Sequence, residues 1–324
     1  MSGRFSRTFC AALLVAAVTA LPVAAQEGAC DSPVSLRGAE IDGHEPVFAR
    51  CVNEAGASQL ATRRWLVGDE TFLLLVDAET IKTQVARAAC WRCAETTDAQ
   101  EAETRFLRAI EGSGNEPETP KALVNLGLTH GQGGGSFLTG DLCPSSRPLD
   151  RGFLELVAKE GAGTPIALSI SGGWMRNHAA DLDWLRDKAE SGALAVSWVN
   201  HSYSHPFVKN RPNEETFLLT KGVDLDAEIL ETERLMLMYG LTPSVFFRFP
   251  GLVSDASLMQ KLRERHLVAL GADSWIALGP RPKAGSIVLV HPNGNEPVGL
   301  KIFARLLQEG KVPKPLRPIE EAPR

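Results

Sequence analysis

From about residue 135 onward, short apolar runs rich in β-forming residues alternate with segments of helical length. Such alternation without hairpin signals indicates a parallel sheet covered by helices. Strands are predicted at 136–139, 165–171, 194–199, 244–249, 267–270 and 286–291. Helices are predicted at 148–159, 180–190, 224–239, 255–265 and 297–309, the third of them capped by Asp224 and ended by Gly240 and Pro243. Six or seven strand–helix units favour a barrel, complete or distorted, over an open sheet.

Residues 26–115 have a different pattern, which predicts a small α+β segment containing cysteines. It holds one strand candidate, at 71–76, and a helical stretch at 81–110. Residues 112–120 have the composition of a linker, so the barrel domain is expected to cover 116–310. The tail, 311–324, contains four prolines and is expected to be extended or disordered.

The first 25 residues have the pattern of a signal peptide. Arg4 and Arg7 precede an apolar run at 9–20, and small residues at 23–25 predict cleavage near Ala25. No later run reaches the roughly 18 apolar residues of a membrane span, so we expect an exported protein, periplasmic or secreted, with no stable membrane insertion. The formal net charge of −5 becomes more negative without the signal, which disfavours nucleic acid as a partner.

Four cysteines of the N-terminal segment are expected to form structural disulfides, because an oxidising compartment favours them. They are Cys30, Cys51, Cys90 and Cys93, and three pairings among them are open. Cys90 and Cys93 could instead form a redox pair, but their surroundings lack a thioredoxin-like strand–helix pattern. Structural bridging is therefore favoured.

Several predicted strands end in residues suited to catalysis, at the position where parallel α/β folds place active sites. His201 and His205 follow one strand four residues apart, a spacing that on one helical turn directs both rings the same way and makes half of a divalent-metal site. The other strand ends carry Asp141, Arg248, Asp273 and His291. Packing does not readily explain charged and imidazole groups at so many strand ends.

The order and spacing of these residues resemble the polysaccharide deacetylase family (NodB-homology, carbohydrate esterase 4 type). The motifs of that family are Thr-Phe-Asp-Asp-Gly, His-Ser/Thr-x-x-His, Arg-x-Pro, an Asp/Trp motif and Leu-x-His. This chain has matching residues at 201–205, 248–250, 273–275 and 289–291, and the resemblance covers roughly 135–307. It implies a distorted (β/α) barrel of about seven parallel strands and a divalent metal, most often zinc, with cobalt or nickel as alternatives.

Carried over by position, the resemblance implies a metal site and a base. His201 and His205 would hold the metal, which polarises an acetyl carbonyl and a water. Asp141, from the first motif, would take a proton from that water as the general base. Arg248 would orient the carboxylate, since its planar fork suits a bidentate contact.

The same resemblance implies an acid and an acetyl pocket. His291 would protonate the leaving amine, and Asp273 would keep that imidazole charged and oriented. The backbone N–H of Gly251 would donate to the tetrahedral oxyanion. Trp275 and Leu289 would form the walls around the acetyl group.

The first motif departs from the family pattern, which has two adjacent aspartates, one as base and one as metal ligand. Here only Asp141 is present, and Leu142 stands at the ligand position. Asp141 could ligate the metal, or remain the base beside a metal held by two histidines and waters, or the site could have lost turnover. Cys143 lies on the same side of the strand as Asp141 and is a further, less favoured, ligand candidate.

These residues favour an exported, metal-dependent hydrolase that removes acetyl groups from N-acetylated sugars of peptidoglycan or another polysaccharide. An O-acetyl ester or a small acyl amide is an alternative substrate. A non-catalytic carbohydrate-binding or scaffold protein is the alternative from another class. The retention of Arg248, Asp273 and His291 speaks against it, since a pure binder needs no leaving-group acid, whereas the missing second aspartate, replaced by Leu142, speaks for it.

Overall fold

The computed structural model describes residues 30, 32, 34–112 and 123–324. Residues 34–324 form one compact unit, to which the description below applies. The predicted signal peptide and most of the predicted linker lie outside the described residues. In the part of the chain that is described, no helix is long and apolar enough to cross a membrane.

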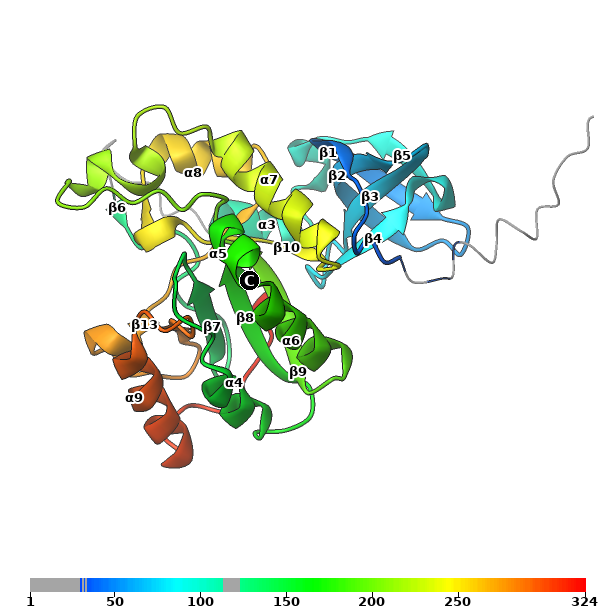
Figure 1. Cartoon of the computed structure of the whole chain (residues 1–324). Coiled ribbons are helices and arrows are strands. Elements are labelled where there is room, and N and C mark those ends of the chain that lie inside the picture. Colours follow the sequence, from blue (N-terminus) through cyan, green and yellow to red (C-terminus); the bar gives the residue numbers. More distant parts are fainter. Residues whose placement is uncertain (1–29, 31, 33, 113–122) are drawn as a thin grey trace, which may run out of the picture. The chain divides into compact units, whose positions relative to one another are not determined.

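A seven-stranded parallel sheet is the centre of the fold (Figure 1). Its order is β12-β10-β9-β8-β7-β14-β13, and β12 and β13 form two edges that do not pair, so the barrel is incomplete. The predicted distorted (β/α) barrel of about seven parallel strands is confirmed. The strands are β7 (Phe137–Leu142), β8 (Thr164–Ile170), β9 (Leu194–Asn200), β10 (Pro243–Phe247), β12 (Val268–Ala269), β13 (Ser274–Trp275) and β14 (Ile287–Val290).

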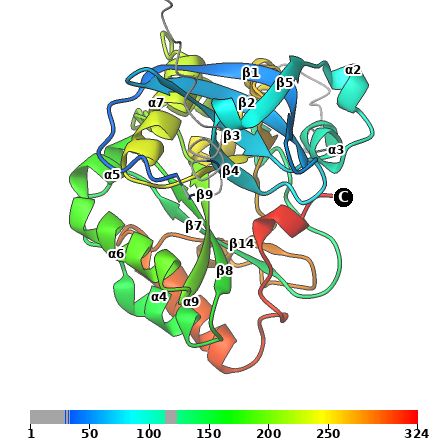
Figure 2. The ribbon, with the colours of Figure 1, turned by 90° about the vertical axis from the view of Figure 1, so that its right-hand side faces the viewer.

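Helices pack against this sheet as the sequence predicts. Apolar residues of α4 (Arg151–Ala158), α6 (Ala179–Glu190) and α9 (Pro297–Gln308) share one buried cluster with side chains of β7 and β8 (Figure 2). Two further helices, α7 (Leu225–Met238) and α8 (Ala256–Arg263), begin at aspartates whose carboxylates accept backbone N–H groups. The short helix α5 (Gly172–Asn177) was not predicted.

Smaller elements connect these strands and helices. Two short strands, β6 and β11, form a separate antiparallel pair, and six 3₁₀ turns occur among the described residues. Their bounds are β6 (Leu123–Val124), β11 (Val253–Ser254) and the turns Ala88–Cys90, Asn213–Glu215, Phe217–Leu219, Pro250–Leu252, Ile276–Leu278 and Ile319–Glu321.

The N-terminal part of the unit is a five-stranded antiparallel sheet of order β4-β3-β2-β1-β5. The strand predicted at 71–76 is confirmed as β3, but the stretch predicted as helical at 81–110 is helical only at 98–101 and from 105 onward, and its first half forms two strands. Ile81 lies in the left-handed region with φ 62°, and the following residues pair with β3, so sheet pairing overrides local composition. The elements are β1 (Asp42–Asn53), β2 (Ser58–Val67), β3 (Glu70–Val76), β4 (Thr83–Arg87), β5 (Trp91–Glu95), α2 (Asp98–Glu101) and α3 (Arg105–Gly112).

The four N-terminal cysteines are all disulfide-bonded. Cys51 of β1 and Cys93 of β5 occupy directly opposite positions in the sheet and form one bridge. Cys30 and Cys90 are also disulfide-bonded. The expected structural bridging is confirmed, and Cys93 does not pair with Cys90 as a redox motif would require.

The C-terminal tail is packed, so of the two expectations, extended or disordered, the second is wrong. Val312, Ile319 and Ala322 are each at most 2% exposed. Ile319 and Ala322 join a buried cluster with residues of the parallel sheet, of α3 and of the N-terminal strands. Four prolines did not prevent this packing, because the apolar residues between them bury against the sheet. The division of the chain near residue 115 stays a prediction.

Candidate active site

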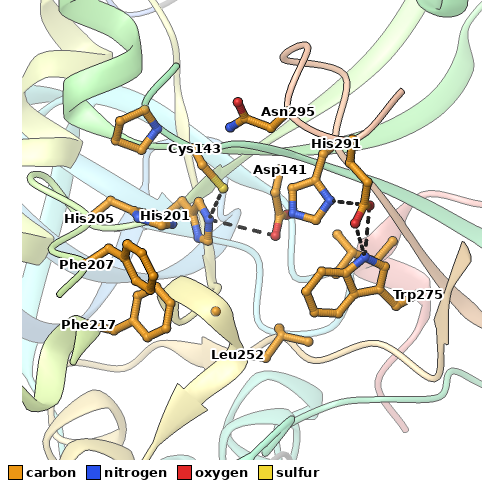
Figure 3. A pocket seen from close by; sticks show the side chains of 14 residues that line it. Asp141, Cys143, His201, His205, Phe207, Phe217, Leu252, Trp275, His291 and Asn295 are labelled. Carbon is orange, nitrogen blue, oxygen red and sulfur yellow. Dashed lines mark hydrogen bonds and ion pairs between the residues drawn. The ribbon is translucent and has the colours of Figure 1, made fainter. Parts of the chain in front are cut away.

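Side chains from four parallel strands converge at the carboxyl-terminal edge of the sheet (Figure 3). They surround a cavity of about 380 Å³, within the roughly 300–1,000 Å³ range of small-ligand sites. The two histidines lie on one side of the cavity, and Asp141, His291 and Trp275 lie on the other. The lining residues are Asp141, Cys143, Pro144, His201, His205, Phe207, Phe217, Gly251, Leu252, Trp275, Leu289, His291, Asn295 and Glu296.

Asp141 and Arg248 form a buried ion pair. Nη1 of Arg248 donates to Oδ1 of Asp141 at 2.9 Å and to Oγ1 of Thr139 at 2.7 Å. The contact uses one guanidinium nitrogen and so differs from the expected bidentate geometry, because Nε and Nη2 donate to carbonyls of Leu270 and Gly271. Burial would raise the pKa of Asp141, but the charge of Arg248, together with smaller contributions from His201, His291 and Ser169, outweighs it, so the pKa is lowered and the carboxylate is ionised at neutral pH.

His201 and His205 converge through a loop, and not on a helical turn as the four-residue spacing suggested. The chain leaves β9 at Asn200 and turns with Ser202 and His205 at positive φ, 66° and 47°. The amide of Asn200 braces this turn, accepting from Ser202 N and donating to the carbonyl of Ile229. The two rings lie 4.8 Å apart between centroids.

Both imidazoles are neutral and suited to a metal ion. Burial lowers the pKa of His201, and burial together with the neighbouring His201 lowers the pKa of His205 to about 3. Nδ1 of His201 lies 2.8 Å from the carbonyl of Arg248, which keeps the proton on Nδ1 and leaves the Nε2 lone pair facing the cavity. Within the described residues, the buried Nε2 of His205 has no hydrogen-bond partner. These donors fit zinc, cobalt or nickel.

Cys143 also reaches this cluster, whereas Leu142 does not. Sγ of Cys143 lies 3.4 Å from Nε2 of His201. Burial, and then the charge of Asp141, raise the pKa of the Cys143 thiol, so it lacks the thiolate character of a cysteine nucleophile. Leu142 is fully buried in the cluster beneath α4 and α6.

His291 is held by Glu296, a residue that the sequence reading missed. Nδ1 of His291 lies 3.0 Å from Oε2 of Glu296, and Nε1 of Trp275 donates to the same carboxylate at 2.9 Å. Burial would raise the pKa of Glu296, but the hydrogen bonds from His291 and Trp275 outweigh it and lower the pKa. An ionised Glu296 accepts the Nδ1 proton of His291 and leaves Nε2 for a reacting group.

Asp273 does not contact His291, which differs from the role expected for it. Its carboxylate lies 2.7 Å from Nδ1 of His130 and accepts from Ser286 Oγ and Ile287 N. Asp273 therefore fastens β14 and the segment that precedes β7. The carboxylate that contacts His291 comes from a different connection, because Glu296 follows the turn 292–295 between β14 and α9.

The remaining predicted residues line the cavity and give it an apolar side. Gly251 has φ 61°, and a Cβ at this position would lie 2.4 Å from the ring of Phe217, so a side chain here would displace that ring. Leu289 and Trp275 lie on the cavity wall, as expected. Phe207, 63% exposed, contacts Phe217 at the rim.

Glu296, Phe207 and Phe217 were not predicted. A signal for Glu296 was present, since a carboxylate five residues after His291, directly before a helix-starting proline, lies at the same sheet edge. The two phenylalanines belong to a loop without periodicity, and their positions depend on the left-handed turns at His205 and Phe217.

No protein-family model matches the sequence. Solved structures similar to the chain include a family 4 carbohydrate esterase from Bacillus anthracis, with a TM-score of 0.46 and 17% identity over 63% of this chain and 97% of that one. A chitin deacetylase from Colletotrichum lindemuthianum has a TM-score of 0.44 and 15% identity, over 60% and 89% of the two chains. A CE4 family pseudoenzyme from Bacillus anthracis has a TM-score of 0.38 and 15% identity, over 56% and 63%. These likenesses leave the function to be inferred from the chain's own side chains.

Proposed function

We propose that this chain is an exported, metal-dependent hydrolase that removes acetyl groups from N-acetylated sugars of peptidoglycan or another polysaccharide. The observation that carries the proposal is that a carboxylate and an imidazole, each held by a charged partner, line one cavity. Asp141, paired with Arg248, and His291, paired with Glu296, lie beside two neutral histidines. A base, an acid and a metal half-site together are suited to amide hydrolysis by an activated water.

Asp141 is suited to the role of base. A divalent ion bound at His201 and His205 would supply Lewis acidity to the acetyl carbonyl and to an attacking water. Arg248 keeps Asp141 ionised, and Oδ2 of Asp141 lies 3.8 Å from Nε2 of His201, so the carboxylate faces the same space as the histidines. Oδ2 can therefore accept a proton from a water in that space.

His291 is suited to protonate the leaving amine. Glu296 accepts the Nδ1 proton and fixes the ring, so the doubly protonated imidazolium form can transfer its Nε2 proton to the amine and leave a neutral ring behind. Trp275 fixes Glu296 in turn and lies beside the His291 ring, with 5.3 Å between centroids. Donation of a proton to the leaving amine is the step that distinguishes this arrangement from a simple carbohydrate-binding site.

The apolar walls suit an acetyl group and a sugar ring. Leu289 and Trp275 line the cavity next to the acid pair, and the backbone N–H of Gly251 is assigned to the oxyanion. The exposed ring of Phe207 offers a flat apolar surface at the rim. The predicted signal peptide and the disulfides are compatible with action on a polymer outside the cytoplasm.

The test combines metal analysis with acetate release from N-acetylglucosamine oligomers. We expect Asp141→Asn to lower acetate release by about 10²- to 10⁴-fold, while His201→Ala and His205→Ala lose the metal. His291→Ala should keep the metal and lose turnover. Lys301→Ala, on the exposed side of α9, serves as a control that retains both.

The proposal would be overturned by a wild-type protein that releases no acetate, and by either of two further results. One is a wild-type protein that binds no stoichiometric zinc, cobalt or nickel; the other is acetate release unaffected by Asp141→Asn. Oligomer binding without acetate release would favour the non-catalytic carbohydrate-binding alternative, for which Leu142 in place of a second aspartate is the supporting observation. Release from O-acetyl esters alone would keep the chemistry and change the substrate.

A further inference from the structure

Strand β7, which carries the first motif, places alternate side chains on opposite faces of the sheet. Asp141 and Cys143 line the cavity, whereas Leu142 between them is fully buried in the opposite hydrophobic cluster. This is the period of two expected for a strand. Leu142 is therefore not a lost ligand that points into the site; the cavity position next to the histidines belongs to Cys143.

The carboxylate of Asp141 is hydrogen-bonded to Arg248 and not to the two histidines. Its Oδ1 is held by Arg248 at 2.9 Å, and the Arg248 fork is itself fixed by backbone carbonyls of Leu270 and Gly271. The nearest approach of the carboxylate to Nε2 of His201 is 3.8 Å, longer than the 3.4 Å from Sγ of Cys143. The sulfur thus lies closer to the histidine lone pair than the carboxylate does.

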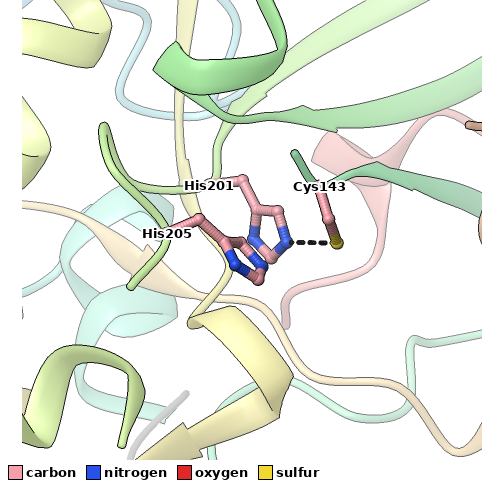
Figure 4. Close-up of side chains that lie close together, drawn as sticks. All are labelled: Cys143, His201 and His205. Atoms are coloured by element: carbon pink, nitrogen blue, oxygen red, sulfur yellow. Dashed lines mark hydrogen bonds between the residues drawn. The ribbon is translucent and has the colours of Figure 1, made fainter. Parts of the chain in front are cut away.

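We propose that Cys143 is the third protein ligand of the metal, completing a Cys–His–His site with His201 and His205 (Figure 4). The inference rests on the metal dependence of the proposed function. It assigns the thiolate as ligand and leaves Asp141 as base, which separates two roles that the sequence left open. A coordinating thiol is deprotonated by the ion it binds.

The spacing of the three donors fits one ion. Their ligand atoms all lie within 4.8 Å of one another. With bond lengths of about 2.0–2.3 Å, ligand atoms in a tetrahedral zinc site lie roughly 3.3–3.7 Å apart, so small side-chain rotations suffice. The partnerless Nε2 of His205 is an independent sign of a ligand, since buried polar atoms are normally paired.

The backbone holds the cysteine in position. Nδ2 of Asn293 donates to the carbonyl of Cys143 at 3.0 Å, which links the end of β7 to the loop after His291. A soft sulfur ligand selects thiophilic ions such as zinc, cobalt or cadmium over magnesium or calcium. The site should therefore differ in metal preference from one built with two histidines and a carboxylate.

Cobalt spectroscopy tests the ligand directly. The full chain is prepared as Cys10→Ser, which removes the cysteine outside the described residues, since Cys30, Cys51, Cys90 and Cys93 are disulfide-bonded. We expect added Co²⁺ to produce a thiolate-to-cobalt charge-transfer band, and Cys143→Ser in this background to abolish it. Zn²⁺ affinity should fall at least ~10-fold, since even outer-sphere changes cost about that much.

Thiol protection gives a second readout that needs no change at residue 143. Without reductant, we expect Zn²⁺ to slow labelling of Cys143 by an aromatic disulfide reagent at least ~10-fold in the Cys10→Ser protein, as a ligand sulfur is shielded. The same ion should give no protection in His201→Ala. This result does not depend on whether Cys143→Ser folds.

The outcomes separate this inference from the proposed function. Stoichiometric Co²⁺ binding without the charge-transfer band, together with unchanged labelling, would overturn the cysteine ligand and leave the metal-dependent hydrolase in place. A protein that binds neither Co²⁺ nor Zn²⁺ would overturn both. The charge-transfer band without acetate release would support the ligand and overturn the hydrolase.

Discussion

Glu296 and Asp273 each hold a histidine, but the two histidines have different surroundings. His291, the partner of Glu296, lines the cavity, whereas His130, the partner of Asp273, is exposed beside the start of β7. Glu296 is therefore a positioning residue for the reaction, and Asp273 is a structural one. Because both are carboxylates that contact a histidine, they form a matched pair for mutation.

Glu296→Gln should lower kcat with little change in KM. The amide keeps the size of the side chain but loses the charge that stabilises a protonated His291, so proton donation slows. We expect a loss between about 10- and 1,000-fold, smaller than that of His291→Ala. Steady-state acetate release at several pH values measures it. The shape of the pH profile should change, which a purely structural effect of the substitution would not cause.

Asp273→Asn is the control for Glu296→Gln. It should lower stability, because Ser286 Oγ and Ile287 N donate to this carboxylate, and leave kcat per folded molecule nearly unchanged. If Asp273→Asn abolished turnover in folded protein while Glu296→Gln did not, the roles assigned to the two carboxylates would be reversed.

At the residue scale, the sequence allows prediction of those contacts that follow from which strands end at the same edge of the sheet. Asp141 and Arg248 meet because β7 and β10 end at the same sheet edge, and alternation put both on its cavity side. The partner of His291 could not be predicted this way. Glu296 reaches His291 only because the turn at 292–295 reverses the chain, and no periodicity describes that turn.

At the scale of elements, β7 shows why the missing aspartate cannot be restored by substitution. Leu142 points away from the cavity, and its side chain is enclosed by buried residues of the cluster that includes Leu154 and Leu182. A carboxylate at residue 142 would enter this apolar cluster without a partner. Metal binding would gain nothing from it.

Leu142→Asp should therefore destabilise the fold by roughly 3 kcal/mol or more, as burial of an unpaired charge does. Leu142→Met, which keeps an apolar side chain of similar volume, should cost less than about 1.5 kcal/mol. Urea unfolding of both variants measures the difference. A Leu142→Asp protein of wild-type stability with tighter zinc binding would contradict the strand orientation described above.

The elements of the parallel sheet were predictable, and those of the N-terminal sheet were not. Buried parallel strands such as β8 are continuous apolar runs, and capping aspartates such as Asp224 mark where helices begin. In the N-terminal sheet, β4 and β5 are short and largely accessible to solvent, and β5 pairs with β1, a strand distant in sequence. Their composition alone therefore suggested a helix.

At the scale of the whole unit, a buried charged cluster joins the N-terminal sheet to α7. Arg63 of β2 donates to both carboxylate oxygens of Glu233 in α7, at 2.7 and 3.0 Å, and each side chain is 1% exposed. Loss of one partner of such a pair costs roughly 3–5 kcal/mol, because the other charge stays buried and unpaired. The two parts of the unit should therefore unfold together.

His44 of β1 makes this cluster sensitive to acid. Its side chain is 3% exposed and lies against Trp65, with Nε2 3.7 Å from Glu233. Burial, and then the charges of Arg63 and Arg234, lower the pKa of His44 from 6.5 to about 3. In the unfolded chain the imidazole binds a proton near pH 6.5, whereas the folded chain keeps it neutral until about pH 3, so stability falls as the pH falls through this window.

His44→Phe should remove that part of the acid sensitivity. Each pH unit between 6.5 and about 3 should cost the wild type up to about 1.4 kcal/mol more than the variant. The apolar ring is tolerated because neither nitrogen of His44 has a hydrogen-bond partner within the described residues. Urea unfolding from pH 7 to pH 4.5, with a chelator present and the disulfides intact, measures both slopes.

His201, His205 and His266 also have lowered pKa values and leave a residual slope in the variant. Equal slopes in the two proteins would show that His44 takes up its proton in the folded state, and that the cluster opens to water under mild acid.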